Sequence, residues 1–172
     1  MMRTLDFRWV YDIPPYEVFR MVTRLDHLQA KAKALRHTNH AVVELRERQG
    51  FFWSSTERQI DVNLPWYAPA LFVPRNKFRQ TQKWHPSEWD GSRFYDTTVE
   101  VTKVPVTIRG YGRLLPMEWY RTEYRVHLEV DSKAFLIGPK IRSFVAERVE
   151  ETLNDEHEFR LRWLQQHTQR AY

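Results

Sequence analysis

The chain contains no cysteine among its 172 residues. This absence excludes disulfides, thiolate nucleophiles and every metal site built on cysteine ligands. No stretch approaches the roughly 18 consecutive apolar residues that span a bilayer. Charged side chains interrupt the apolar residues of segment 1–11, so a secretory signal peptide is not expected either. Together these absences predict a cytoplasmic protein.

Glycine is also scarce, with five residues, and the sequence shows no flexible linker, internal repeat or low-complexity tract. A chain of 172 residues fits one domain, so residues 1–172 are predicted to form a single folded unit. The apolar share of 42% is large enough to build a core, which argues against disorder.

The formal net charge of +5 permits attraction to anionic partners. The 22 acidic residues are interspersed with the basic ones, however, which is typical of a solvated surface and does not favour nucleic-acid binding. Arg75, Lys77 and Arg79 follow an apolar segment and would suit a transient contact with anionic membrane headgroups.

Hydrophobic periodicity predicts both helices and strands. Residues 5–11 alternate as in a half-buried strand, and Pro14-Pro15 end it. Apolar residues then recur at helical spacing over 16–36, with Asp26-His27 as a break between two shorter helices. Further strands are predicted at 41–48, 51–62, 78–85, 94–104, 106–115 and 120–131. A helix about 40 Å long should follow over 139–166.

A helix of this length must lie along a large partner, and the sheet is the only candidate. The predicted order therefore indicates an α+β chain with the helix-grip fold. In this fold a curved antiparallel sheet of about six to seven strands wraps round a long C-terminal helix.

The segment Val126–Trp163 carries a family resemblance. It runs from VHLEVDS through AFLIGPKI into a helix that ends in FRLRWL, with a small apolar turn at Leu136, Ile137, Gly138 and Lys140. This pattern resembles the START-like superfamily (SRPBCC, birch-pollen-allergen type), and within it a bacterial subfamily of unknown function. The resemblance implies a cavity that accepts lipids, sterols, polyketides or quinones. It does not imply a reaction, because members of this superfamily include both carriers and enzymes.

The leading hypothesis is binding or transport of a hydrophobic small molecule between the sheet and the final helix. The residues predicted to line the cavity are Phe7, Trp9, Trp84, Tyr124, Val126, Phe144 and Val145. Gln80 and Gln82 share a face with Phe78 and Trp84, where they would orient the ligand or pair with neighbouring strands.

Residues 63–76 combine three prolines with strongly apolar side chains, which excludes a regular central strand. Trp66, Tyr67 and Phe72 are predicted to contact the ligand as a lip over the cavity. A permanent plug of the core, or contact with a membrane or partner, are the alternatives for this loop.

Known catalytic and cofactor motifs are absent. The seven histidines are expected to be surface residues, because His37 and His40 have H-x-x-H spacing but lie in basic surroundings, and no metal or cofactor is predicted. Gly110 and Gly112 are not followed by a third glycine and instead indicate a close approach within the sheet.

Two other functions stay open. One is a cyclase- or hydrolase-type enzyme that uses an inward carboxylate such as Asp96 or Glu57, whose pKa would rise on burial. The other is an interaction module with a filled core. The sequence favours a non-catalytic protein, and it specifies neither the ligand nor an oligomeric state.

Overall fold

The computed structural model describes residues 2–59, 77–102, 104–134 and 136–168. The elements of the N-terminal part are β1 (Arg3–Tyr11), α1 (Pro15–Thr23), α2 (Leu25–Ala34), β2 (Thr38–Arg48) and β3 (Phe51–Gln59). Those that follow are β4 (Lys77–Trp84), β5 (Arg93–Val101), β6 (Val106–Met117), the 3-10 turn η1 (Glu118–Tyr120), β7 (Arg121–Ser132) and α3 (Gly138–Thr168).

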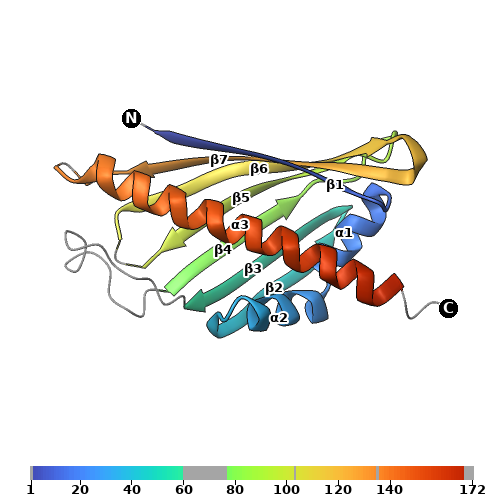
Figure 1. The fold of residues 1–172 in the computed structure, drawn as a ribbon, viewed down its shortest axis with the longest axis horizontal. Helices are drawn as coiled ribbons and strands as arrows, with labels where there is room; N and C mark the ends of the chain where they lie inside the picture. Colours follow the sequence, from blue (N-terminus) through green and yellow to red (C-terminus); the bar gives the residue numbers. More distant parts are fainter. Residues whose placement is uncertain (1, 60–76, 103, 135, 169–172) are drawn as a thin grey trace.

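The described strands form one seven-stranded antiparallel sheet in the order β1-β7-β6-β5-β4-β3-β2 (Figure 1). Strands β2 to β7 are joined as successive neighbours, whereas β1 crosses to the far edge and pairs with β7. Helices α1 and α2 occupy the connection between β1 and β2, so the two edge strands are consecutive in sequence.

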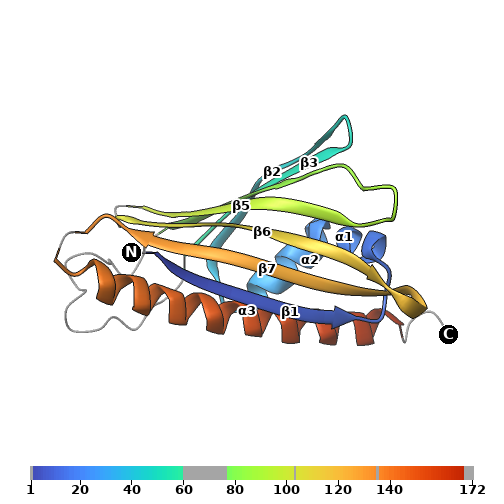
Figure 2. The same ribbon diagram turned by 90° about the horizontal axis from the view of Figure 1, so that it is seen from above.

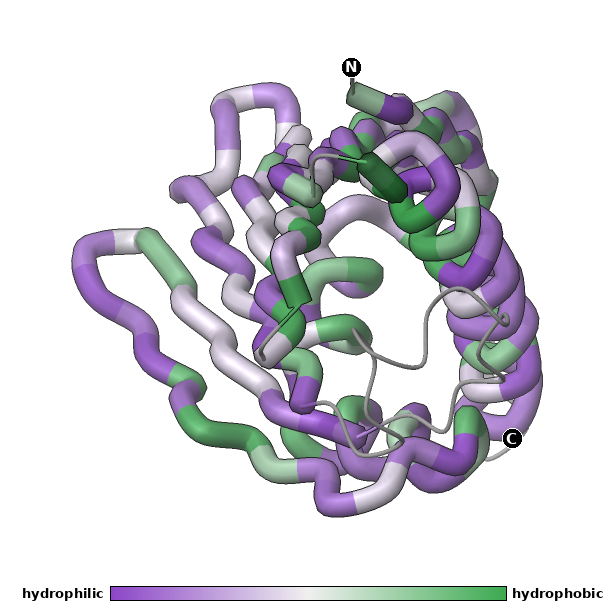
Figure 3. Tube along the Cα trace, turned by 90° about the vertical axis from the view of Figure 1, so that its left-hand side faces the viewer, coloured by the Kyte–Doolittle hydropathy of each residue, from purple (hydrophilic) through white to green (hydrophobic). Residues whose placement is uncertain are grey.

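Helix α3 runs along the concave side of the sheet and packs on β1 and β7 (Figures 1 and 2). Helix α2 contacts both β2 and α3, and so connects the far edge of the sheet to the long helix. Viewed along the long axis, the sheet curves round the interior with α3 on its open side (Figure 3). This is the predicted helix-grip fold, and the prediction is confirmed. Within the described residues, no helix has both the length and the apolar character needed to cross a membrane.

Strand β7 shows why the sequence pattern was informative. Its side chains at Thr122, Tyr124, Val126, Leu128 and Val130 are buried on the concave face. The strand predicted over 120–131 begins at Tyr120, but the side chain of this residue is 82% exposed. The difference arises because Tyr120 belongs to η1 and has a positive φ of 56°, so the strand alternation begins only after it.

The break between the first two helices lies at Arg24 rather than at Asp26-His27. Arg24 has an extended backbone conformation, and Asp26 is in the first turn of α2. There its carboxylate accepts the backbone N–H of His27 at 2.8 Å. An acidic residue is favoured at this position because the helix N-terminus carries partial positive charge.

Candidate ligand-binding cavity

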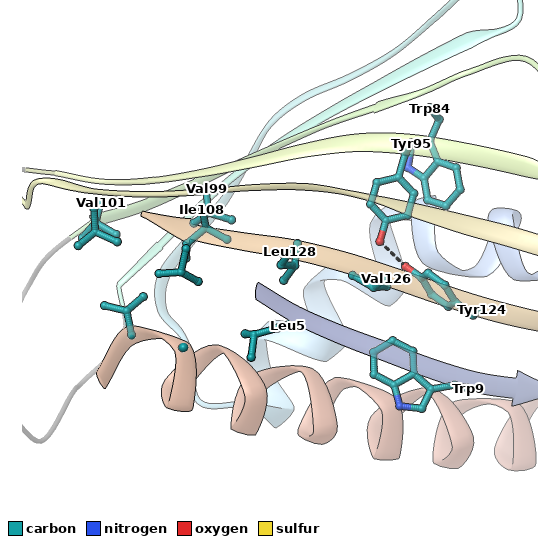
Figure 4. Close-up of a cluster of buried hydrophobic side chains, with 14 of the residues drawn as sticks. Leu5, Trp9, Trp84, Tyr95, Val99, Val101, Ile108, Tyr124, Val126 and Leu128 are labelled. Atoms are coloured by element: carbon teal, nitrogen blue, oxygen red, sulfur yellow. Dashed lines mark hydrogen bonds between the residues drawn. The ribbon is translucent and has the colours of Figure 1, made fainter. Parts of the chain in front are cut away.

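A cavity of about 320 Å³ lies between the concave face of the sheet and the helices α2 and α3. Strands β5, β6 and β7 form an apolar wall with Tyr95, Val99, Val101, Ile108, Val126 and Leu128 (Figure 4). The facing side of α3 contributes Phe144, Val145, Val149 and Leu153. Because these side chains alternate along each strand, the wall is the inward face of an ordinary pleated sheet.

The cavity has a second, polar wall on β3, β4 and β5. The strand register places Ser54, Gln82 and Thr97 in one row across the sheet, and Thr56 beside Gln80 in the next. Both glutamine side chains have their oxygen occupied: Gln80 Oε1 accepts from Arg58 Nη1 at 3.2 Å and Gln82 Oε1 from Trp84 Nε1 at 3.3 Å. Each amide also carries two N–H donors.

Six of the residues predicted from the sequence lie in the cavity wall. They are Gln80, Gln82, Tyr124, Val126, Phe144 and Val145. Contact of these residues with a ligand stays a prediction. Trp66, Tyr67 and Phe72 lie outside the described residues, and the same holds for the predictions made for the loop 63–76.

The structure corrects the prediction for Trp84, which is fully buried but does not line the cavity. Its ring packs between Tyr95, at a centroid distance of 4.3 Å, and Phe19 on α1, at 5.2 Å. Helix α1 therefore covers Trp84 at this end of the sheet, and Tyr95 takes its place in the cavity wall.

Phe7 and Trp9 likewise belong to the core rather than to the cavity wall. Phe7 stacks on Trp9 at 5.4 Å, and Trp9 stacks on His157 of α3 at the same centroid distance. The reason is that α3 packs directly on the edge strand β1, which leaves no space between them.

Neither carboxylate suggested for acid-base chemistry faces the cavity. Asp96 alternates with the inward residues Tyr95 and Thr97, so its side chain points outward, is 68% exposed and contacts His85 Nε2 at 2.8 Å. Glu57 also lies on the outer face, where it pairs with Lys77 at 3.5 Å and Arg79 at 3.4 Å.

A group of charged side chains at the cavity was not predicted. Lys31 of α2, Arg58 of β3, and Glu156 and Arg160 of α3 all line it. Glu156 accepts from both neighbouring cations, with Lys31 Nζ at 3.4 Å from Oε1 and Arg160 Nη2 at 3.1 Å from Oε2. Arg160 also donates to the Tyr11 hydroxyl at 3.4 Å.

These cations keep Glu156 ionised. Burial alone would raise its pKa, but Lys31, Arg160 and Arg58 outweigh that effect and lower the pKa to about 2. A carboxyl group with so low a pKa holds no proton at neutral pH and is a weak base. Glu156 is therefore suited to holding the cations in place rather than to proton transfer.

The expectation that the histidines are surface residues is wrong for His27 and incomplete for His37. His27 is 1% exposed and packs edge-on against Phe159 and Trp163 at 5.2 and 5.0 Å. His37 is half-buried and lines the cavity. Burial, together with neighbouring cations, lowers the pKa of His27 to about 3 and that of His37 to about 4, so both are neutral at pH 7.

One sequence signal could have revealed the charged group. The apolar stripe of α3 passes through Val145, Val149 and Leu153, and its heptad continuation falls on Glu156 and Arg160. Charged residues at inward positions of an amphipathic helix indicate a buried polar site, because burying them unpaired is costly. Arg58 offered no such signal, since many exposed strand residues look the same.

The curved sheet and the long helix α3 that packs on it form a START-like helix-grip fold. The family model described as "Protein of unknown function (DUF2505)" matches residues 6–164, and the chain belongs to that family. No curated protein matches the chain.

Among solved structures, the fold is similar to the ZhuI aromatase/cyclase from Streptomyces sp. R1128. The identity is 14%, with 92% of this chain and 91% of that chain covered and a TM-score of 0.61. It is also similar to a START superfamily protein from Mycobacterium smegmatis, at 14% identity, 94% and 98% coverage and a TM-score of 0.60. At these identities the likeness concerns the fold.

Proposed function

We propose that this protein binds a hydrophobic small molecule, of lipid, quinone or polyketide type, in the cavity between the sheet and α3. The observation that carries the proposal is the cavity itself, whose volume of about 320 Å³ falls in the range of small-molecule sites. One wall is apolar and the other offers convergent polar groups, a combination typical of such sites. The similarity in fold to an aromatase/cyclase and to a START superfamily protein supports the proposal.

Binding without catalysis is the form of the proposal that the side chains favour. Asp96 points out of the cavity, and Glu156 is held as a carboxylate by its neighbours. The wall therefore offers groups that can orient a ligand. Such groups are sufficient for a protein that transports or stores its ligand.

The test combines native mass spectrometry of gently purified protein with titration of a neutral fluorescent probe, N-phenylnaphthylamine. We expect either a bound mass that organic extraction removes or saturable probe fluorescence in the extracted protein. Val149→Trp, which fills the cavity, should abolish probe binding. The matched control Leu161→Trp lies on the same helix with 45% of its side chain exposed and should bind normally. Protein that carries no extra mass and never binds the probe would contradict the proposal.

A further inference from the structure

Charge is unbalanced at the polar wall of the cavity. Lys31, Arg58 and Arg160 bring three positive charges to its interior part, where Glu156 is the one carboxylate among the described residues; Arg148, Glu151 and Asp155 line the cavity with exposed side chains. The neighbouring His37 adds none, because its pKa of about 4 leaves it neutral at pH 7. Among the described residues of this interior part, cations therefore outnumber carboxylates by two.

Of these three cations, Arg58 is the one that forms no ion pair with a described residue. Its side chain is 9% exposed, and its guanidinium donates from Nη1 to the neutral amide of Gln80 at 3.2 Å. Nε is buried and makes no hydrogen bond with any described residue. No Asp or Glu within the described ranges lies at ion-pair distance from Arg58. The nearby carboxylate of Glu156 is engaged by Lys31 and Arg160.

Such an arrangement is unfavourable in an empty cavity. Buried charges in proteins are normally paired and hydrogen-bonded, since removing a lone ion from water costs several kcal/mol. Within the described residues, the Arg58 guanidinium makes one hydrogen bond, and its acceptor is a neutral amide. An anionic group on the ligand would offset this desolvation cost by pairing with Arg58.

The groups around Arg58 select for hydrogen-bond acceptors. Gln80 and Gln82 line the cavity with their oxygens engaged by Arg58 and Trp84, and each amide also carries two N–H donors. Thr97 Oγ1, in the same row as Gln82, is buried without a partner among the described residues and can donate as well. Arg58 and these donors therefore converge from three adjacent strands, whereas the inward residues of β6 and β7 and the α3 residues Phe144, Val145 and Val149 are largely apolar.

From this arrangement we infer that the ligand is an amphipathic acid whose anionic head, a carboxylate or a similar oxyanion, pairs with Arg58 beside Gln80 and Lys31 while its apolar body lies against α3. The inference rests on the proposed function, which it narrows to acidic ligands. Lys31 would share its charge between Glu156 and the incoming anion, and Glu156 would keep Arg160 in place.

The test compares dodecanoate with dodecanol, which have the same chain and differ in the charge of the head. Each is titrated against protein loaded with N-phenylnaphthylamine at neutral pH. The wild-type protein should bind dodecanoate more tightly by about tenfold or more, as a charge-assisted contact predicts. Arg58→Gln should weaken the binding of dodecanoate but not that of dodecanol, so that the two affinities become similar. The matched control Arg79→Gln removes the same charge from the outer face, next to Gln80, and should keep the preference.

Equal affinities in the wild-type protein, or a preference that survives Arg58→Gln, would overturn the inference and leave the proposed function standing. If neither compound displaces the probe and the probe itself does not bind, the proposed function fails as well. A second measurement needs no variant. The carboxyl ¹³C resonance of bound, labelled dodecanoate should titrate at a lower pH than that of the free acid, and titration at the free-acid pH would overturn the inference.

Discussion

The hydroxyl oxygens of Tyr95 on β5 and Tyr124 on β7 lie 2.7 Å apart, although β6 runs between the two strands (Figure 4). Gly112 on β6 makes this contact possible, because it pairs with Tyr95 and has no side chain beneath the ring. The two tyrosines form part of the cavity wall at its aromatic end. The shape of that wall therefore depends on a glycine that does not line the cavity.

Removal of either hydroxyl should destabilise the protein. Tyr95→Phe or Tyr124→Phe leaves the other hydroxyl buried without its partner, which we expect to lower the free energy of unfolding by about 1–3 kcal/mol in urea denaturation. The double variant should cost less than the sum, since no unpaired hydroxyl remains. Tyr111→Phe, on the outer face and 41% exposed, is the control and should change little. Additive single losses would contradict the pairing.

Gly112→Ala should be destabilising for a steric reason. A Cβ atom at this position would lie 2.2 Å from carbon atoms of the Tyr95 ring, so the ring must move. We expect a loss of about 1–3 kcal/mol in unfolding free energy, as for other overpacked cores. In a Tyr95→Val background the same substitution should cost far less. An equal loss in both backgrounds would show that the ring is not the cause.

Stability should fall below neutral pH because of two histidines, the buried His27 and the half-buried His37. The pKa values of His27 and His37 are lowered from 6.5 to about 3 and about 4, mainly by burial. Between those values and 6.5 the folded state binds fewer protons than the unfolded state, so the unfolding free energy decreases as the pH falls.

The slope should approach about 1.4 kcal/mol per pH unit for each histidine. His27→Phe should remove the part of this slope that His27 contributes. At pH 5 the variant should therefore be more stable than the wild type. Urea denaturation at several pH values between 7 and 4 measures both effects. A variant with the wild-type slope would contradict the assignment to His27.

Glu156→Gln should be among the most destabilising single substitutions on α3. It leaves Lys31 and Arg160 buried beside a neutral amide, and breaking a buried ion pair in this way costs about 3–5 kcal/mol. The control is Glu151→Gln, whose partner Arg148 and own side chain are 45% and 59% exposed; it should cost less than about 1 kcal/mol. Thermal unfolding distinguishes the two, and equal losses would argue against a special role for Glu156.

Asp96→Asn should leave both probe binding and stability nearly unchanged. Its carboxylate is 68% exposed on the outer face, and a solvent-exposed contact such as the one with His85 contributes little to the free energy of unfolding. A large loss of probe affinity, measured as above, would require Asp96 to reach the cavity, which the strand alternation excludes.

Much of the fold could be predicted because its determinants are local. The alternation of β7 and the helical spacing of α3 each specify one buried face, and the order of the elements then leaves few ways to bury both. The break at Arg24 was missed by two residues, because helix ends depend on individual backbone conformations and contacts.

The cavity was harder to predict because inward-facing residues do not all line it. Trp84 and Trp9 face inward like Tyr124, yet α1 and α3 cover them. Which part of a concave face stays open depends on where the helices dock, and periodicity carries no information on that. The charged residues were missed for a related reason, since only the packed structure brings Lys31 of α2 to Glu156 of α3.

The pairing of β1 with β7 also sets the order in which the chain can fold. Near the end of β1, the Thr122 hydroxyl donates to the Ile13 carbonyl at 2.7 Å, across 109 residues of sequence. During synthesis β1 is made first but finds its partner only after β7 has left the ribosome, whereas each strand from β3 onward pairs with its predecessor. Contacts this distant in sequence slow folding and leave the early strand unpaired in the meantime. The nascent chain therefore carries a bare strand edge, the feature that chaperones protect from aggregation, until its sheet is nearly finished.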